Sequence, residues 1–131
     1  MKTKENTSPL RSRDKVVQAL YEMELSNSRL DELLKDNEML ERYPHFEDLL
    51  SGVVKSMDNI DELLNRYIDR DLSSIDPVEK NIIRLAIYEL TSTKLDKPII
   101  IDESIRLTKK YGSQDGYKYV NAILDKIIKS H

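Results

Sequence analysis

The amino-acid sequence predicts an all-α fold, and three of its features carry that prediction. Apolar residues recur at spacings of three and four along most of the chain, which is the periodicity of an amphipathic helix. Charged residues make up 34% of the sequence, as suits a helical and highly soluble protein. Only three glycines and four prolines occur among 131 residues, so few tight turns are available for a sheet. We count about seven helices, no strand pattern and no internal repeat.

One segment, DPVEKNIIRLAIYEL from Asp76 to Leu90, has the pattern of a central helix. Asp76 is a preferred N-cap residue, and Pro77 suits the first turn, where a backbone N–H has no partner in any case. Glu79 follows the cap by three residues, which makes a D-x-x-E variant of the capping box. The apolar positions cover roughly half of the helix circumference, so we expect other helices to contact this one on two sides. They are Val78, Ile82, Ile83, Leu85, Ala86, Ile87 and Leu90.

The same periodicity places the remaining helices. Residues 1–10 are expected to form a flexible arm, and residues 11–131 a single helical domain. A break is expected at Tyr43-Pro44, because the residue before a proline avoids the helical region. Gly112 fits the C-terminal cap of the next-to-last helix. Besides the central helix, the expected helical segments are about 13–26, 28–37, 46–57, 60–68, 100–111 and 117–128.

The net charge of −3 conceals a segregation of charge along the chain. Residues 1–15 carry five basic and two acidic groups, and residues 94–131 carry eight basic and five acidic groups. Residues 22–62 carry four basic and twelve acidic groups. Solvated helix faces explain this pattern, and so does a protein with one face for a polyanion and another for a basic partner. Charge alone leaves both interpretations open.

The sequence lacks the residue patterns of the common catalytic and metal sites. There is no cysteine for a disulfide or a thiolate metal site, and His45 and His131 lie far apart. No glycine-rich phosphate loop, nucleophile elbow or metalloprotease motif is present. No apolar run approaches the roughly 18 residues of a membrane span, and no signal peptide opens the chain. We therefore expect a cytoplasmic protein without catalysis, cofactor, metal or membrane partner.

Two stretches are candidates for contact with nucleic acid. Arg11, Arg13 and Lys15 lie at the start of the first helix, where positive charge opposes the helix dipole and where phosphate contact would give it a use. On this stretch alone, a solvated helix start is the favoured alternative. In the second stretch, Tyr117 continues an apolar stripe and is expected in the core. Tyr119 lies on another face and is the candidate for an exposed ring that stacks on an unpaired base.

Three stretches, taken together, resemble the NusB family of bacterial transcription antitermination proteins. They are RSRDKVVQALYEMELS (Arg11–Ser26), DPVEKNIIRLAIYEL (Asp76–Leu90) and IIIDESIRLTKKYGSQDGYKYVNAILDK (Ile99–Lys126), and their order and spacing match the family. The resemblance implies two small helical bundles joined around a central helix, here 11–58 and 59–131. It also implies binding to boxA-type RNA of nascent rRNA transcripts, as a heterodimer with the ribosomal protein NusE. That heterodimer joins the RNA polymerase antitermination complex, and some members of the family form homodimers instead.

The resemblance also assigns RNA-binding roles by position. The arginine-rich motif falls on Arg11 and Arg13, the following aromatic on Tyr21, the acidic residue of the central helix on Glu79, and the turn before the last helix on Asp115, Lys118 and Tyr119. The sequence departs from the family pattern in several places. Pro9-Leu10 precedes only two arginines, Gly116 and Tyr117 stand where serine and histidine are common, and Tyr119 replaces the usual phenylalanine.

Two alternatives to an RNA-binding antitermination factor stay open at this point. The short arginine motif is compatible with a helical adaptor that keeps the protein partner and has weak or lost RNA binding. Similar helical domains also form the N-terminal part of rRNA cytosine methyltransferases. Because no nucleotide-binding domain follows in this sequence, only an RNA-binding fragment of such an enzyme would fit.

Overall fold

The computed structural model describes residues 9–130, with side chains from residue 12 onward. This part of the chain contains eight α-helices and one 3₁₀ helix and has no strand, which confirms the all-α prediction with one helix more than we counted. None of its helices is long and apolar enough to cross a membrane. The arm expected over residues 1–10 lies outside the described residues, except that Pro9 and Leu10 already belong to the first labelled helix.

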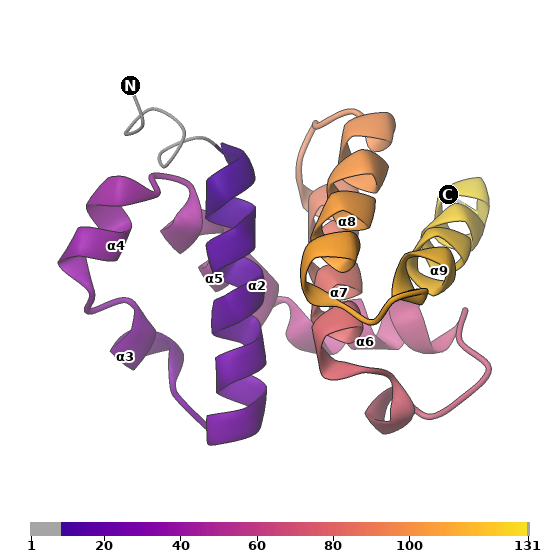
Figure 1. Ribbon diagram of the computed structural model, residues 1–131, viewed down its shortest axis with the longest axis horizontal. Helices are drawn as coiled ribbons and strands as arrows, with labels where there is room; N and C mark the ends of the chain where they lie inside the picture. The colour runs from indigo at the N-terminus through magenta and orange to yellow at the C-terminus, as the bar shows by residue number, and fades with distance from the viewer. Residues whose placement is uncertain (1–8, 131) are drawn as a thin grey trace. The chain divides into compact units, whose positions relative to one another are not determined.

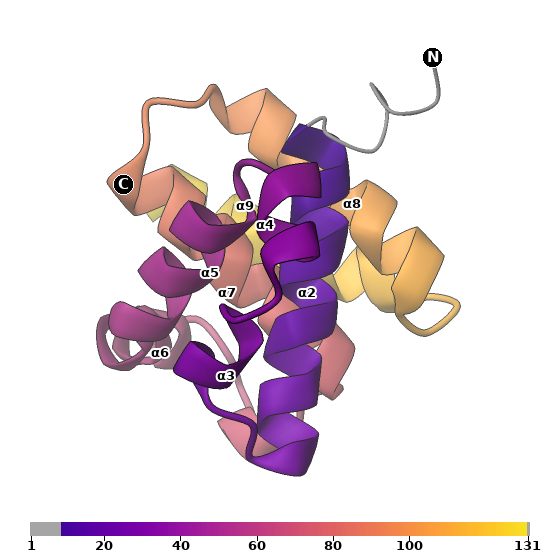
Figure 2. The same cartoon turned by 90° about the vertical axis from the view of Figure 1, so that its left-hand side faces the viewer.

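The chain divides into two compact units, Met1–Lys55 and Ser56–His131. The first unit holds α2 (Pro9–Ser26), α3 (Leu30–Leu33), α4 (Asn37–Arg42) and α5 (Phe46–Lys55). Helix α5 packs against α2 and α4, and Figures 1 and 2 show α3 and α4 one after the other along the length of α2. The core of this unit is formed mainly by apolar residues of α2 and α5. Its buried apolar residues are Val16, Val17, Ala19, Leu20, Tyr43, Phe46, Leu50 and Val53.

Helix α2 is longer than the sequence predicted. It begins at Pro9 rather than near Arg13, and a proline is tolerated in the first turn of a helix. The helix ends as predicted at Ser26. Asn27 follows in the left-handed conformation with φ 57°, and its N–H donates to the Met23 carbonyl at 3.1 Å. Asparagine is one of the few residues with a side chain that occupies this conformation readily, so it ends the helix.

The single helix expected after Ser28 is in fact two short helices. The Asp36 side chain accepts a hydrogen bond from the Met39 N–H at 3.1 Å, so it caps a second helix at the end of the expected segment 28–37. Arg29 is the N-cap of α3, and its backbone N–H donates to the Glu32 carboxylate at 2.9 Å. Helix α4 ends before Tyr43-Pro44, as predicted.

The second unit is built around α7, the predicted central helix. It contains α6 (Met57–Asn65), the 3₁₀ helix η1 (Leu72–Ser74), α7 (Pro77–Ser92), α8 (Lys97–Tyr111) and α9 (Gly116–Ser130). Helix α7 contacts α6, α8 and α9, which confirms that other helices surround it (Figure 1). Its buried apolar residues are Ile82, Ile83, Leu85, Ala86 and Ile87. Five of the seven apolar positions predicted for this helix are therefore buried, and Val78 and Leu90 are half-buried.

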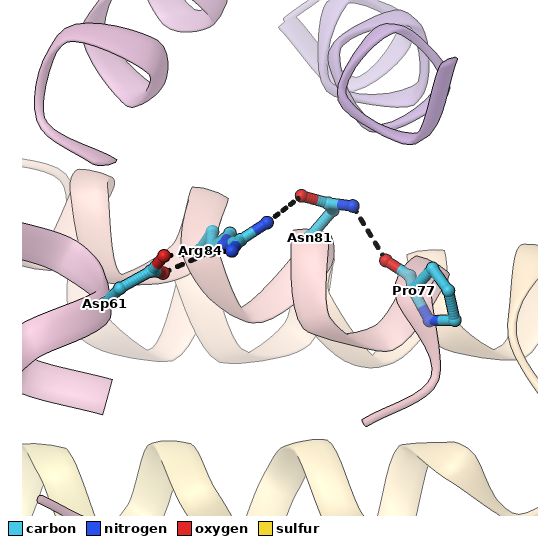
Figure 3. Close-up of polar contacts among 4 residues, drawn as sticks. All are labelled: Asp61, Pro77, Asn81 and Arg84. Atoms are coloured by element: carbon cyan, nitrogen blue, oxygen red, sulfur yellow. Dashed lines mark hydrogen bonds and ion pairs between the residues drawn. The ribbon is translucent and has the colours of Figure 1, made fainter. Parts of the chain in front are cut away.

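A chain of polar contacts joins α6 to α7 (Figure 3). The Arg84 guanidinium donates from Nε and Nη2 to the two carboxylate oxygens of Asp61, each at 2.9 Å. It also donates from Nη1 to the Asn81 side-chain oxygen at 3.0 Å, and the Asn81 amide donates to the Pro77 carbonyl at 2.8 Å. A partly buried, bidentate pair of this kind is stronger than a single exposed ion pair and fixes orientation. It holds α6 against the polar side of α7.

The burial of α7 allows us to predict how much stability is lost when Leu85 is truncated. Replacing this fully buried leucine by alanine should lower the free energy of unfolding by about 2–5 kcal/mol, because the lost burial is compounded by a cavity. Urea unfolding followed by circular dichroism measures the loss. The matched control is Leu25→Ala on α2, since Leu25 is 57% exposed and its truncation should change stability by less than about 0.5 kcal/mol. Equal losses for the two variants would contradict the predicted packing.

Candidate nucleic-acid interface

Only one half of the predicted capping box forms at the start of α7. The Asp76 carboxylate accepts hydrogen bonds from the backbone N–H groups of Val78 at 2.9 Å and Glu79 at 3.1 Å. The predicted return bond from Glu79 to the cap is replaced by bonds to Ser113, in the turn between α8 and α9. Glu79 Oε2 accepts from the Ser113 N–H at 2.9 Å and from its hydroxyl at 2.6 Å. Ser113 offers two donors to one carboxylate oxygen, whereas the cap position offers one.

The Glu79 carboxylate therefore fastens the α8–α9 turn to the start of α7. Glu79 is only 6% exposed, and a buried carboxylate is tolerated when charge-assisted hydrogen bonds replace its water. Ser113 lies 34 residues away in sequence and supplies both bonds. The turn leads directly into the first turn of α9, which carries Lys118 and Tyr119. Glu79 thus helps to fix the backbone position of Lys118 and Tyr119.

Two glycines make room for this carboxylate. A Cβ atom at Gly116 would overlap the Glu79 carboxylate, and one at Gly112 would lie 2.9 Å from the Thr108 carbonyl and 3.2 Å from Glu79 Oε2. Gly112 ends α8 as predicted, but its φ of −91° is not the left-handed conformation usual for a glycine cap. Close approach, rather than backbone conformation, requires glycine at both positions.

A substitution at Gly116 tests this arrangement. Gly116→Ala should destabilise the protein by about 1–3 kcal/mol, the usual cost of inserting a methyl group into filled space, although alanine is ordinarily the better helix former. The measurement is urea unfolding of Gly116→Ala in the wild-type and Glu79→Ala backgrounds. With the carboxylate removed, the added methyl group should cost little. A penalty of the same size in both backgrounds would show that Glu79 is not what excludes a side chain there.

The predicted basic residues at the start of α2 differ in their surroundings. Arg11 belongs to the helix, but its side chain lies outside the described part of the structure. Arg13 is 6% exposed and interacts with another residue of the protein, whereas we expected a solvent-facing side chain. Lys15 is half-buried, with its Nζ 5.5 Å from the centroid of the Tyr43 ring. Tyr21, at 37% exposed, presents an accessible aromatic ring on this helix.

The turn before α9 presents Asp115 to solvent, and the first turn of α9 presents Lys118. Their side chains are exposed, and the Lys118 Nζ lies 3.7 Å from Asp115 Oδ1. An exposed pair at this spacing contributes little to stability. It does place the ammonium group of Lys118 near the start of α9.

The two tyrosines of α9 are both half-buried, which corrects the expectation of one core ring and one exposed ring. The Lys109 Nζ lies 4.7 Å from the centroid of the Tyr117 ring, so this ring meets a charged neighbour at the surface of the unit. The Arg70 guanidinium lies over the Tyr119 ring at 4.8 Å. The Tyr119 hydroxyl is buried and has no hydrogen-bond partner among the described residues.

Burial raises the pKa of the Tyr119 phenol, and the carboxylates of Asp69 and Glu79 raise it further. The positive charge of Arg70 opposes these effects in part. An acid whose pKa is raised above its ordinary value stays protonated at neutral pH, so the ring is uncharged there. Sequence periodicity gave no signal for Arg70, because it lies in an irregular segment between α6 and η1.

Fold and surface together define an all-helical protein of two units, with basic residues in the first half of α2 and basic and aromatic residues at the start of α9. No cluster of histidine and carboxylate side chains suited to a metal ion occurs within residues 9–130. The NusB family model matches residues 10–129, which is nearly the whole chain. The protein belongs to the NusB family.

Similar proteins agree with this assignment over nearly their full lengths. The Transcription antitermination protein NusB of Shewanella frigidimarina (strain NCIMB 400) is 40% identical over 126 residues, covering 91% of this chain and 93% of that protein. A T. maritima NusB structure has 33% identity and a TM-score of 0.86, covering 96% of this chain and 94% of that one. A crystal structure of NusB and NusE in complex with dsRNA has a TM-score of 0.80 and covers 100% of this chain and 99% of that one. At 24% identity, this last likeness concerns the fold.

Proposed function

We propose that this protein is a transcription antitermination factor that binds boxA-type RNA of nascent rRNA transcripts together with the ribosomal protein NusE. The observation that carries the proposal is the match to the NusB family over residues 10–129, the whole described domain except its last residue and Pro9. Relatives named transcription antitermination protein NusB share up to 40% identity with it. The same fold occurs in a crystal structure with NusE and RNA.

This function needs no catalysis. The protein acts by binding, as an adaptor that brings RNA and NusE to the RNA polymerase antitermination complex. Acting on nascent transcripts places it in the bacterial cytoplasm. The alternative of an adaptor without RNA binding differs in one measurable respect, because such a protein would bind NusE and leave boxA-type RNA unbound.

In this proposal, the RNA contacts are divided by chemistry. Arg11 and Lys15 on α2 and Lys118 on α9 bind phosphates, which supplies affinity that weakens with salt. Tyr21 offers an exposed ring for an unpaired base. Three other predicted residues act indirectly. Arg13 supports the start of α2 from its buried position, Asp115 orients Lys118, and Glu79 holds the turn in front of α9.

Lys118 provides a test of the phosphate contact. Lys118→Ala should weaken binding of boxA-type RNA in the presence of NusE and make the plot of log K against log salt less steep by about one unit. The measurement is a fluorescence anisotropy titration at several salt concentrations. Lys129→Ala is the matched control, because Lys129 is also exposed on α9 and also pairs with an aspartate, Asp125, at 3.0 Å. If the two variants had the same salt slope, Lys118 would not be a phosphate contact.

The acidic segment 22–62 leads us to predict that the rate of association with NusE depends on salt. Its excess of negative charge should steer a basic partner, so the association rate should fall markedly between about 0.05 and 0.3 M salt as screening increases. Stopped-flow measurement gives this rate directly. Replacing Glu38 and Glu41, both exposed on α4, by glutamine should slow association further, whereas Asp125→Asn on α9 should not. A rate indifferent to salt would count against steering and favour apolar docking.

A further inference from the structure

We propose that Arg70 is an additional RNA-contacting residue, whose guanidinium, stacked on the Tyr119 ring, offers its other face to an unpaired base and its charge to a phosphate. The proposal rests on the RNA-binding function proposed above. Arg70 lies in the segment between α6 and η1, which neither helical periodicity nor the family motif singled out. Three features of its surroundings support the assignment.

The first feature is the position of the guanidinium. Its central carbon lies 4.8 Å from the centroid of the Tyr119 ring, which is within the range of a cation–π contact. The Arg70 side chain is still 51% exposed, and its Nε lies 3.6 Å from an oxygen of the exposed Asp69. Arg70 is therefore held in place on one side and accessible on the other. A planar cation in this state is pre-organised for stacking and for phosphate contact.

The second feature is the state of Tyr119 itself. Its hydroxyl is buried without a hydrogen-bond partner, and its ring is half-buried. The hydroxyl end of the ring therefore lies inside the protein, and the guanidinium lies over one face of the ring. The ring acts as a platform for Arg70 in this arrangement. Bases stack on arginine guanidinium planes as well as on aromatic rings, so covering the ring moves the stacking surface outward.

The third feature is the neighbouring charge. Lys118 precedes Tyr119 in the first turn of α9 and is exposed. Arg70 therefore adds a second cation, from a different segment of the same unit, on the ring of the residue that follows the proposed phosphate contact. Alternating cationic and aromatic groups are the usual composition of a surface that binds single-stranded nucleic acid.

The main rival is that Arg70 swings away and Tyr119 stacks on the base directly. The two arrangements make opposite predictions for Arg70→Ala. If Arg70 contacts RNA, the variant loses both a stacking plane and a charge. If Arg70 only covers the ring, its removal exposes Tyr119, and binding is unchanged or tighter.

The experiment is a titration of the full chain with single-stranded boxA-type RNA in the presence of NusE, at several salt concentrations. Arg70→Ala should weaken binding roughly tenfold and make the salt slope less steep by about one. Arg70→Lys should keep the slope but bind more weakly than wild type, because an ammonium group has no plane to stack. Tyr119→Phe should bind as wild type does, since the hydroxyl has no partner.

Arg29→Ala is the matched control, because Arg29 is an exposed arginine paired with a nearby aspartate, Asp31, at 3.3 Å, and it makes no cation–π contact with the described residues. It should bind RNA like wild type, and circular dichroism should show all variants folded. Wild-type affinity for Arg70→Ala, or tighter binding, would overturn the role of Arg70 while leaving the proposed function intact. Failure of the wild-type chain to bind this RNA with NusE would overturn both.

Discussion

The arrangement of the second unit depends on one buried carboxylate. Glu79 lies in the first turn of α7, and an ionised group in that position has to be hydrogen-bonded inside the protein. Ser113 meets this requirement with two donors at 2.9 and 2.6 Å. Because Ser113 lies between α8 and α9, the same bonds bring the end of one helix and the start of the next to the start of α7. Gly112 and Gly116 allow the approach by leaving space beside the carboxylate.

The other polar contacts of α7 serve the same architecture at a different place. Arg84 binds Asp61 through two parallel hydrogen bonds, which fastens α6 to α7 with a defined orientation. The apolar side of α7 provides most of the burial, and apolar burial is not directional. The hydrogen bonds of Glu79 with Ser113 and of Arg84 with Asp61 are directional. They therefore define how the neighbouring helices are positioned along α7, which apolar packing alone would not do.

These fastenings also determine which side chains remain for a ligand. Glu79 uses its bonds within the protein, and Arg13 is buried, so neither is a free surface group. Lys118 is exposed at the start of α9, whose position the Glu79 contact helps to define. A surface for RNA built on the start of a fastened helix loses little conformational freedom on binding. In the proposed function, Glu79 acts through its contact with Ser113 rather than through contact with RNA.

The sequence by itself determined the all-helical fold, most helix positions and the central place of α7, because helical periodicity and the Asp76 cap are local properties. It did not reveal the break at Asp36, where a capping aspartate interrupts one weak apolar pattern. The family resemblance pointed to Glu79, Arg13 and Tyr119 as site residues, but the burial and contacts of their side chains depend on the tertiary structure. Glu79 bonds to a residue 34 positions away, and Arg70 covers Tyr119 from an irregular segment. Such contacts depend on which segments meet in space, and no local spacing records that.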